Sequence, residues 1–343
     1  MRRLEPAVRE RLLAGINRPR RRDDLLRLGL TDGDLKRLVR NRTLQRFWKW
    51  YVDGTFDPEA ARVLCALSSY PGAVLSHFTA ARLAGLRTWT RHDTSEKPVC
   101  LTRTRRFGRR SHGPDLALRV ARLDLGDLRR FRVAGPDDPL ACLDGAPMTA
   151  PARTVVDLAR QLPLAEALVT VDHALALMVG RDELENVLDR QCGWPGVQAA
   201  RQAIGLGDPQ SESVLESIAR AVFAEAGLPA PVLQAQFFDG ERWTPERTDF
   251  WWPQFRTHAE ADGLAKFEAA TPAERRRLHR AAFVREQRLA AHGAELVRFG
   301  WEDAVHEPAD LVRRLRQAFA RGLRRTGPPI RWRVAPPGFE ASW

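Results

Sequence analysis

The stretch RTDFWWPQFRTHAEADGLAK, residues 247–266, contains two short segments of strand-like composition on either side of Pro253. The first segment holds Asp249, followed by the residues FWW, which are of types enriched in β-strands. Because proline cannot continue a central strand, we predict that the chain turns at Pro253 and forms a hairpin. Side chains alternate between the two faces of a strand, so Glu260 and Asp262 in the second segment are expected to share one face.

Carboxylates in this arrangement suit a metal-dependent phosphodiesterase. With Asp249 on the neighbouring strand, Glu260 and Asp262 would complete a set of hard oxygen ligands for Mg²⁺ or Mn²⁺, ions that bridge carboxylates and substrate phosphates. The alternative is a solvated acidic strand face. Spacing alone favours this alternative, because an Asp followed at some distance by Glu-x-Asp is a pattern that many sequences match by chance.

The whole chain is basic and long enough for more than one domain. Its 343 residues, of which 44% are hydrophobic, are sufficient for two or three domains with separate cores. The 55 Lys and Arg residues against 43 Asp and Glu residues give a net charge of +12, which favours a polyanionic partner, with nucleic acid as the first candidate. The alternative is a surface that is generally rich in arginine, so the position of the charges matters more than their total.

The cysteines and the termini indicate a cytoplasmic protein without a membrane segment. No C-x-x-C motif occurs, and the four cysteines lie far apart, which argues against a zinc site or a disulfide framework: Cys65, Cys100, Cys142 and Cys192. The N-terminus lacks the apolar stretch of a signal peptide. Acidic residues interrupt the most apolar run, residues 165–180, so we expect no contact with a membrane.

Residues 1–57 are expected to form a winged helix-turn-helix that binds DNA. A short helix is predicted before Gly29, and Thr31 with Asp34 forms a capping box that starts a second helix. Residues 43–52 suit a small β-wing. Four basic residues would contact phosphates on or next to the second helix: Lys36, Arg37, Arg40 and Arg42. Gln45 could reach a base edge; the alternative is a helical hairpin with a solvated basic face.

Residues 58–207 are expected to form a central region of helices and strands. His77 stands at a predicted helix start without an evident nucleophile nearby, so we reject a role as catalytic base. From Pro151 the pattern is helical, and Arg153 and Asp157 are spaced i, i+4. This spacing favours an intrahelical ion pair over a functional site.

Residues 208–320 are expected to form a last domain, a small mixed sheet with flanking helices, followed by an irregular tail at 321–343. Ser213 and Glu216 form a predicted capping box, so Glu216 has a structural role. It also lies one helix before Asp249 and could supplement a metal shell directly or through water. The fold class expected for the whole chain is α+β or mixed α/β.

Several of these segments resemble known families. The N-terminal RDDLLRLGLTDGDLKRLVRNRTLQRFWKWYV with AVLSHFTAARLAGL resembles the winged-helix region of AbiE-type antitoxin-like proteins, and MTAPARTVVDLAR resembles the signature that commonly follows it. The C-terminal third resembles a very-short-patch-repair-like endonuclease domain of the restriction-endonuclease-like fold. The segments that carry this second resemblance are SESVLES, TDFWWP, EADG, LAKF and REQRLAAHGAELVRFGW.

The second resemblance implies a Mg²⁺-dependent nuclease. It implies that Asp249 and Glu260 bind the metal, that Asp262 completes or orients the shell, and that Arg285 and Arg298 neutralise phosphate charge. The sequence departs from the superfamily motif Glu-x-Lys, because Asp262 holds the place of the lysine. Lys266 lies beyond Gly263 and could reach back; His258 is a second departure, either as an extra ligand or base or as a sign of relaxed constraint.

Two functions therefore compete. The first is a DNA endonuclease that docks through the winged helix, with double-stranded DNA as the expected substrate, and hydrolyses phosphodiester bonds with the C-terminal domain. The second is a transcriptional repressor or an antitoxin-like partner of a protein toxin, in which the nuclease fold is degenerate and inactive. The second predicts DNA binding that depends on Arg37 or Arg40 and needs no metal.

Overall fold

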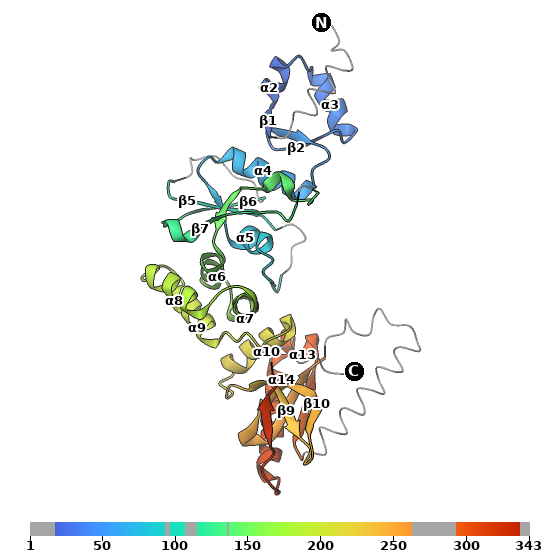
Figure 1. Cartoon of the computed structure of the whole chain (residues 1–343), viewed down its shortest axis with the longest axis vertical. Coiled ribbons are helices and arrows are strands. Elements are labelled where there is room, and N and C mark those ends of the chain that lie inside the picture. Colours follow the sequence, from blue (N-terminus) through green and yellow to red (C-terminus); the bar gives the residue numbers. More distant parts are fainter. Residues whose placement is uncertain (1–17, 93–96, 107–114, 136, 263–292, 337–343) are drawn as a thin grey trace, which may run out of the picture. The chain divides into compact units, whose positions relative to one another are not determined.

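A computed structural model describes most of the chain, and Figure 1 labels many of its elements. The fold is α+β, as expected, and the described part of the chain contains one antiparallel sheet and two mixed sheets accompanied by helices. The chain divides into two compact parts, Met1–Leu86 with Thr94–Leu158, and Arg87–Asp93 with Ala159–Trp343. Among the described helices, none combines the length and the apolar character needed to cross a membrane. The described residues are 18–92, 97–106, 115–135, 137–262 and 293–336.

The first part begins with the expected winged helix-turn-helix. Its elements are β1 (Arg20–Arg21), α2 (Arg22–Arg27), α3 (Asp32–Arg40), β2 (Leu44–Phe47) and β3 (Trp50–Asp53). Gly29 takes φ 92° between the helices, a left-handed conformation that glycine adopts without steric cost. The strands pair in the order β1-β3-β2. The helices pack on this sheet through a small core of Leu25, Leu30, Leu35, Leu38, Leu44 and Tyr51.

A mixed sheet fills the rest of the first part. Its strands run in the order β6-β5-β4-β8-β7, with β4–β8 and β5–β6 parallel and the other pairs antiparallel. The strands are β4 (Val74–Leu75), β5 (Val99–Arg103), β6 (Leu116–Val120), β7 (Leu128–Arg130) and β8 (Pro147–Thr149). The helices are α4 (Pro58–Ser69), α5 (His77–Leu83) and α6 (Pro151–Ala159).

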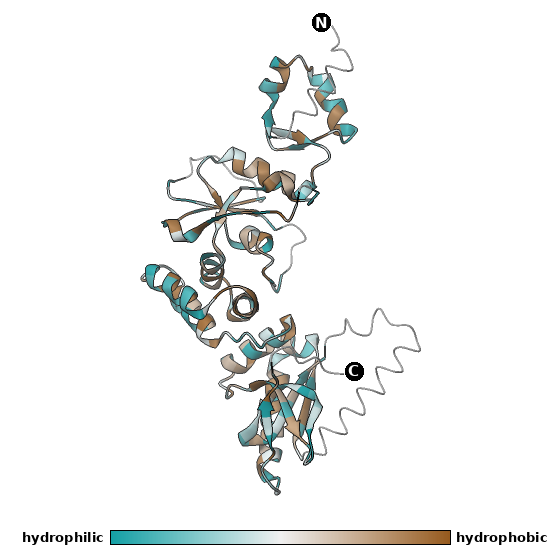
Figure 2. Ribbon diagram, viewed as in Figure 1, coloured by the Kyte–Doolittle hydropathy of each residue, from teal (hydrophilic) through white to brown (hydrophobic). Residues whose placement is uncertain are grey.

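The second part combines helices with a five-stranded mixed sheet. The helices are α7 (Leu164–Leu177), α8 (Arg181–Arg190), α9 (Val197–Leu206), α10 (Val214–Glu225), α13 (Trp301–Val305) and α14 (Pro308–Arg324). Figure 2 shows α7 as largely hydrophobic, in contrast to the hydrophilic α8. The sheet order is β12-β11-β10-β9-β13, with strands β9 (Val232–Phe238), β10 (Trp243–Trp252), β11 (Thr257–Ala261), β12 (Glu295–Phe299) and β13 (Trp332–Val334).

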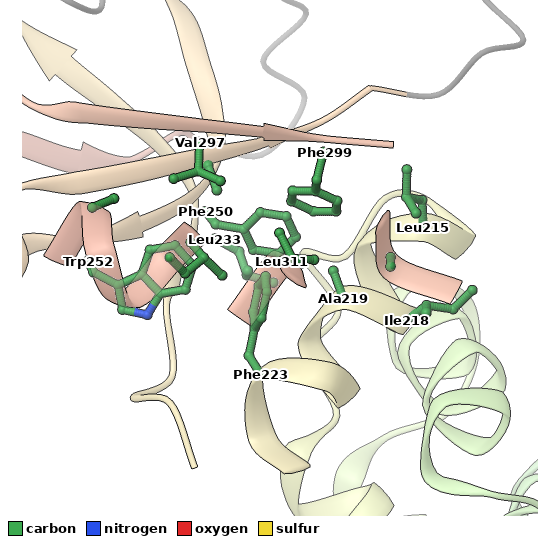
Figure 3. Packing of buried hydrophobic residues seen from close by; sticks show 14 of the residues in the cluster. Leu215, Ile218, Ala219, Phe223, Leu233, Phe250, Trp252, Val297, Phe299 and Leu311 are labelled. Atoms are coloured by element: carbon green, nitrogen blue, oxygen red, sulfur yellow. The ribbon is translucent and has the colours of Figure 1, made fainter. Parts of the chain in front are cut away.

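The hairpin predicted around Pro253 forms the centre of this sheet. Strands β10 and β11 are antiparallel with Phe250 opposite Ala259, and a 3-10 turn over Pro253–Phe255 joins them. Phe250 packs edge-to-face against Phe223 of α10, with ring centroids 5.4 Å apart. Figure 3 shows this contact beside Leu311 of α14, so both helices cover the same face of the sheet. This apolar packing holds the acidic residues of the hairpin in fixed positions.

The C-terminal segment is more regular than expected. Helix α14 continues to Arg324 and so crosses the limit expected at residue 320. Strand β13 pairs with β9, with Trp332 opposite Phe237, so part of the segment expected to be an irregular tail belongs to the sheet. The domain limits at 57, 207 and 320 remain predictions. Strand β9, which lies between α10 and the hairpin, was not expected from the sequence.

Candidate functional site

Helix α3 presents a basic face to solvent. Leu35 and Leu38 are buried on one side of the helix, and the exposed residues recur three and four apart on the other side. We name Lys36, Arg37 and Arg40 the α3 basic face. Arg42 is also exposed, directly after the helix, with φ 56°. The structure therefore places all four predicted phosphate contacts on the surface of the winged helix.

Two acidic residues at the start of α3 are held by partners. The Asp34 carboxylate accepts from the backbone N–H of Thr31 at 3.0 Å, while the Thr31 hydroxyl accepts from the Asp34 N–H at 3.1 Å, which confirms the predicted capping box. Asp34 also accepts from Arg37. The Arg22 guanidinium hydrogen-bonds to Asp32 and lowers the pKa of that carboxyl. These contacts offset the negative charge next to the α3 basic face.

The wing carries further arginine and lysine side chains on aromatic rings. Arg46 lies over Tyr51, at 5.6 Å from the guanidinium carbon to the ring centroid, and the ammonium of Lys49 lies 5.6 Å from the ring of Trp50. Gln45 differs from expectation. Its amide donates to the backbone oxygen of Phe56 at 2.6 Å, so it supports the turn after the wing and does not point toward a base edge.

The C-terminal sheet contains the predicted acidic residues. Glu216 lies in the first turn of α10, where the Ser213 hydroxyl accepts from its backbone N–H at 3.1 Å. The Glu216 carboxylate does not accept from the Ser213 backbone N–H, so only half of the predicted capping box forms. It accepts instead from the Glu212 backbone N–H at 2.9 Å and from Gln234 Nε2 at 3.1 Å, and only 6% of Glu216 is exposed.

Asp249 lies opposite Gln234 in the sheet. The pairs on either side, Thr248 with Ala235 and Phe250 with Leu233, fix this register. The Asp249 carboxylate accepts from the backbone N–H of Ala261 at 2.8 Å and so bridges to the strand that carries Glu260. Gln234 has φ 51°, a conformation that costs a non-glycine residue of order 1–3 kcal/mol.

Glu260 lies beside Arg298 on the next strand. The two residues are paired in the parallel β11–β12 register, and Arg298 Nη2 lies 3.4 Å from Glu260 Oε2. Glu260 is 2% exposed, so the alternative of a solvated acidic strand face is wrong for this residue. Gln234, Asp249, Glu260 and Arg298 thus stand on four neighbouring strands with Glu216 near Asp249; we name Glu216, Asp249 and Glu260 the acid row.

The electrostatics of the acid row favour a proton or a cation. Burial, and after it the charge of Asp249, raises the pKa of Glu216 to about 8. Both causes favour the protonated form of Glu216 over the ionised form. Arg298 supplies one positive charge at the other end of the row, beside Glu260.

The other predicted site residues have separate partners or fall outside the described residues. Asp262 is exposed just beyond β11, and its backbone N–H donates to Phe299. His258 is fully buried, with Nδ1 3.3 Å from the Thr248 hydroxyl, so it has a structural environment. Lys266 and Arg285 fall in the segment 263–292, which is outside the described residues.

The donor set of the acid row bears on whether it can hold a metal ion. Among the residues that the structure describes, no three acidic, histidine or cysteine side chains are grouped closely enough to hold one metal ion. Glu260 also faces Arg298, which would compete with a metal for the carboxylate. The described donors as arranged therefore do not fit a Mg²⁺ or Mn²⁺ site.

Two partners of predicted residues were not foreseen. Gln234 holds Glu216, and its left-handed backbone has no signature in the sequence. Arg153 forms the predicted ion pair with Asp157 at 2.8 Å, but it also binds Asp127 at 2.7 Å, across 26 positions of sequence. All three side chains are almost fully buried, so this group stabilises the first part of the chain and is not a surface site.

Comparison with known proteins places the chain in a family. Residues 78–206 match the model of the AbiEi antitoxin C-terminal domain, which confirms the antitoxin-like part of the resemblance. The match ends before the acid row, so the endonuclease-like part remains a proposal. Two uncharacterized proteins of Mycobacterium tuberculosis, MT2308 of strain CDC 1551 / Oshkosh and Rv2248 of strain ATCC 25618 / H37Rv, are each 34% identical over 282 residues, which covers 81% of this chain and 93% of each relative. The chain thus belongs to the same family as these mycobacterial proteins, and its residues 78–206 match the AbiEi antitoxin C-terminal domain.

Proposed function

We propose that the protein is an antitoxin-like transcriptional regulator that binds double-stranded DNA through the α3 basic face. The observation that carries this proposal is the exposure of Lys36, Arg37 and Arg40 on the second helix of a helix-turn-helix. That helix is the element that enters the major groove in helix-turn-helix proteins. The AbiEi antitoxin match at residues 78–206 supports the regulatory role.

The positive charge of the α3 basic face favours nucleic acid over a protein partner. Three cations on one helical face, followed by Arg42, can each neutralise a phosphate and release a counterion. Arg22 neutralises the neighbouring Asp32, and the ion pair between Asp34 and Arg37 is exposed, so a phosphate can replace Asp34 as the partner of Arg37 at little cost. DNA affinity is therefore expected to fall steeply as the salt concentration rises.

The test is DNA binding by the triple variant Lys36→Ala/Arg37→Ala/Arg40→Ala, measured by fluorescence anisotropy on a duplex from upstream of the gene and on a shuffled duplex. We expect Kd at about 50 mM salt to rise about 100-fold, and the slope of log K against log salt to lose nearly three units, about 0.9 per contact. Binding should persist in EDTA, because no metal takes part in it.

The control variant Arg190→Ala/Arg201→Ala/Arg313→Ala removes the same charge from exposed positions outside the winged helix. It should bind DNA nearly as the wild type does. Equal losses in both triple variants would mean that net charge alone drives binding and would contradict the proposal. Circular dichroism and thermal unfolding verify that both variants are folded.

A protein toxin as partner is part of the same proposal. The match of residues 78–206 to an antitoxin domain favours it. The measurement is co-expression with the product of the neighbouring gene, followed by co-purification and a growth assay. If that product is harmless and does not co-purify, the antitoxin role is wrong while DNA binding can still hold.

The second candidate is a Mg²⁺-dependent DNA endonuclease in the C-terminal part. The observation that favours it is the meeting of Glu216 and Asp249 beside Glu260, from three different elements of the fold. Lys266, Arg285 and Arg298 belong to this candidate as the residues that would contact phosphate or activate water. The described donors do not fit a metal ion, so the candidate stands behind DNA regulation.

Its test is cleavage of supercoiled plasmid with Mg²⁺, with Mn²⁺ and with EDTA. Wild-type protein should be compared with Asp249→Ala and Glu260→Ala, and with Glu225→Ala, an exposed glutamate of the same helix α10 as Glu216, as the control. Cleavage that needs metal and disappears only in the first two variants would establish the nuclease. Cleavage that is unchanged in them would be assigned to a contaminant.

A further inference from the structure

The segment Arg331–Val334 at the edge of the C-terminal sheet is exposed and basic. All four residues are exposed, and β13 lies at the end of the strand order next to β9. The surrounding sequence, residues 311–339, contains eight arginines and no aspartate or glutamate. Edge strands are commonly kept soluble by charge, so charge alone does not indicate a partner. The arrangement of the arginines is more informative.

Two of these arginines stack on aromatic rings. The guanidinium carbon of Arg331 lies 4.2 Å from the ring centroid of Phe238, and that of Arg333 lies 4.3 Å from the ring centroid of Trp243. The two rings contact each other edge-to-face at 5.4 Å. We name Arg331, Arg333, Phe238 and Trp243 the arginine–aromatic ladder. It is built by pairing in the sheet, since Phe238 pairs with Trp243 and its N–H donates to Arg331.

The ladder holds its guanidinium groups in place. Arg333 Nε donates to Gln236 Oε1 at 2.8 Å, and Gln236 is 2% exposed and donates in turn to Thr244. Stacking occupies the face of a guanidinium but leaves the N–H groups at its edge available. Within the described residues, neither Arg331 nor Arg333 lies within 4.0 Å of a carboxylate, unlike the neighbouring Arg321 and Arg325, which pair with Glu295.

We infer that the arginine–aromatic ladder is a second nucleic-acid surface, which binds the phosphodiester backbone through Arg331 and Arg333. A planar guanidinium matches phosphate oxygens with two parallel hydrogen bonds. The two residues are two positions apart on an extended segment, about 6.6 Å, so both side chains can engage one strand of nucleic acid. Because stacking fixes these side chains in advance, less entropy is lost on binding.

This inference rests on the proposed function, because it assigns a further contact to the same class of partner. It differs from that function in its residues and its location in the chain. The α3 basic face lies in the first compact part, whereas the ladder lies in the second. The two surfaces can therefore be removed independently in the full-length protein.

The experiment is binding of Arg331→Ala/Arg333→Ala to a fluorescent duplex and to one of its strands alone, over a range of salt concentrations. On the probe that the ladder binds, we expect about tenfold weaker binding at low salt and a loss of nearly two units in the salt slope. Comparison of the duplex with the single strand shows whether the ladder binds double-stranded or single-stranded nucleic acid. Arg201→Ala/Arg313→Ala removes two exposed charges from the same compact part and should change neither quantity as much.

A lysine variant and a competition experiment provide two further tests of the ladder. Arg331→Lys/Arg333→Lys retains the charge but loses the planar fork, so it should recover less than half of the lost free energy of binding. Full recovery, or competition by polyglutamate as effective as that by single-stranded DNA, would overturn the ladder as a phosphate site. So would unchanged affinity and salt slope on both probes in the alanine variant.

The α3 triple variant separates this inference from the proposed function. In that background, Arg331→Ala/Arg333→Ala should still reduce the residual binding. If the α3 variant binds as the wild type does while the ladder variant does not, the proposed role of α3 fails and the ladder stands. If only the α3 variant loses affinity, the ladder fails and the proposed function stands. Unchanged thermal unfolding verifies that each variant is folded.

Discussion

The α3 basic face and the acid row both consist of charged side chains, but water reaches only the first of them freely. Lys36, Arg37 and Arg40 are exposed, whereas Glu216 and Glu260 are almost completely buried. An exposed charge contributes little to stability, because water already solvates it. A buried carboxylate costs several kcal/mol unless hydrogen bonds, a proton or a cation compensate for the burial.

The difference separates what each region can do. The α3 basic face is available to a polyanion without rearrangement, so its role is expected in affinity and salt dependence. The acid row is held by Gln234, by backbone N–H groups and by Arg298, so its role is expected first in the pH dependence of stability. Charge substitutions in the α3 basic face should therefore change DNA affinity and leave stability nearly unchanged. Charge substitutions in the acid row should change stability and leave DNA affinity nearly unchanged.

The largest expected effect on stability is that of Glu216→Gln at alkaline pH. The folded protein raises the pKa of Glu216 to about 8, so it holds this proton more tightly than the unfolded chain does. The resulting stabilisation is complete below the ordinary pKa of about 4.5 and is lost as the pH rises through about 8. The stability of the variant relative to the wild type should therefore increase by about 2–4 kcal/mol between about pH 5 and pH 9.

Urea unfolding at a series of pH values measures this effect. Glu225→Gln, on the exposed side of the same helix, is the matched control and should show no such trend. DNA binding at neutral pH should be the same for both variants and the wild type. A constant difference between Glu216→Gln and the wild type across the pH range would show that Glu216 does not titrate in the folded protein as proposed.

A smaller effect is expected for the coupling between Asp249 and Glu216. Asp249→Asn keeps an oxygen for the Ala261 N–H but removes the charge that raises the pKa of Glu216. At about pH 8, Asp249→Asn should raise the free energy of unfolding of the wild-type protein. It should have a smaller effect in the Glu216→Gln variant, and the difference between the two effects should be about 1 kcal/mol. A double-mutant cycle in urea measures it, and additive effects would mean that the two carboxyls do not interact.

The sequence predicted local structure well because local rules decide it. The Thr31–Asp34 capping box, the helix break at Gly29 and the hairpin at Pro253 each depend on residues within a few positions of one another. The acidic residues Asp249 and Glu260 were found for the same reason, since strand alternation and the turn align them. The fold class followed from this order of elements.

The contacts that compensate the buried charges could not be predicted in this way. Gln234 reaches Glu216 from a strand that was not foreseen, and Asp127 reaches Arg153 from the short 3-10 helix Leu125–Asp127. Both contacts depend on tertiary packing, which brings together residues without any periodic relation in sequence. The burial of Glu260 likewise depends on the packing of the whole sheet, so the pattern of charges alone favoured a solvated face.

Thr31→Ala is expected to have a modest effect on stability and on the position of α3. The Thr31 hydroxyl accepts from the Asp34 N–H at 3.1 Å and donates to the Asp34 carboxylate at 2.7 Å. Loss of such a cap typically costs about 1 kcal/mol. Thermal unfolding measures the loss, and Thr31→Ser, which keeps the hydroxyl, should restore most of it. DNA affinity should decrease slightly, because the first turn of α3 frays; an unchanged unfolding temperature would contradict the capping role.

Arg37→Ala is expected to change stability least among these substitutions. Its effect on DNA affinity should be much larger than its effect on stability. Arg37 and Asp34 form an exposed i, i+3 ion pair on α3, and Arg27 and Asp24 form another on α2. Removing either arginine should cost less than about 0.5 kcal/mol of stability, because exposed pairs contribute little. Only Arg37 belongs to the α3 basic face, so Arg37→Ala should also lower the salt slope of DNA binding by about 0.9, whereas Arg27→Ala should leave it unchanged. If both substitutions reduce the slope equally, the helix-turn-helix attracts DNA through its total charge and α3 makes no specific phosphate contact. If only Arg37→Ala reduces the slope, the phosphates bind to the exposed face of α3 and not to the charged surface as a whole.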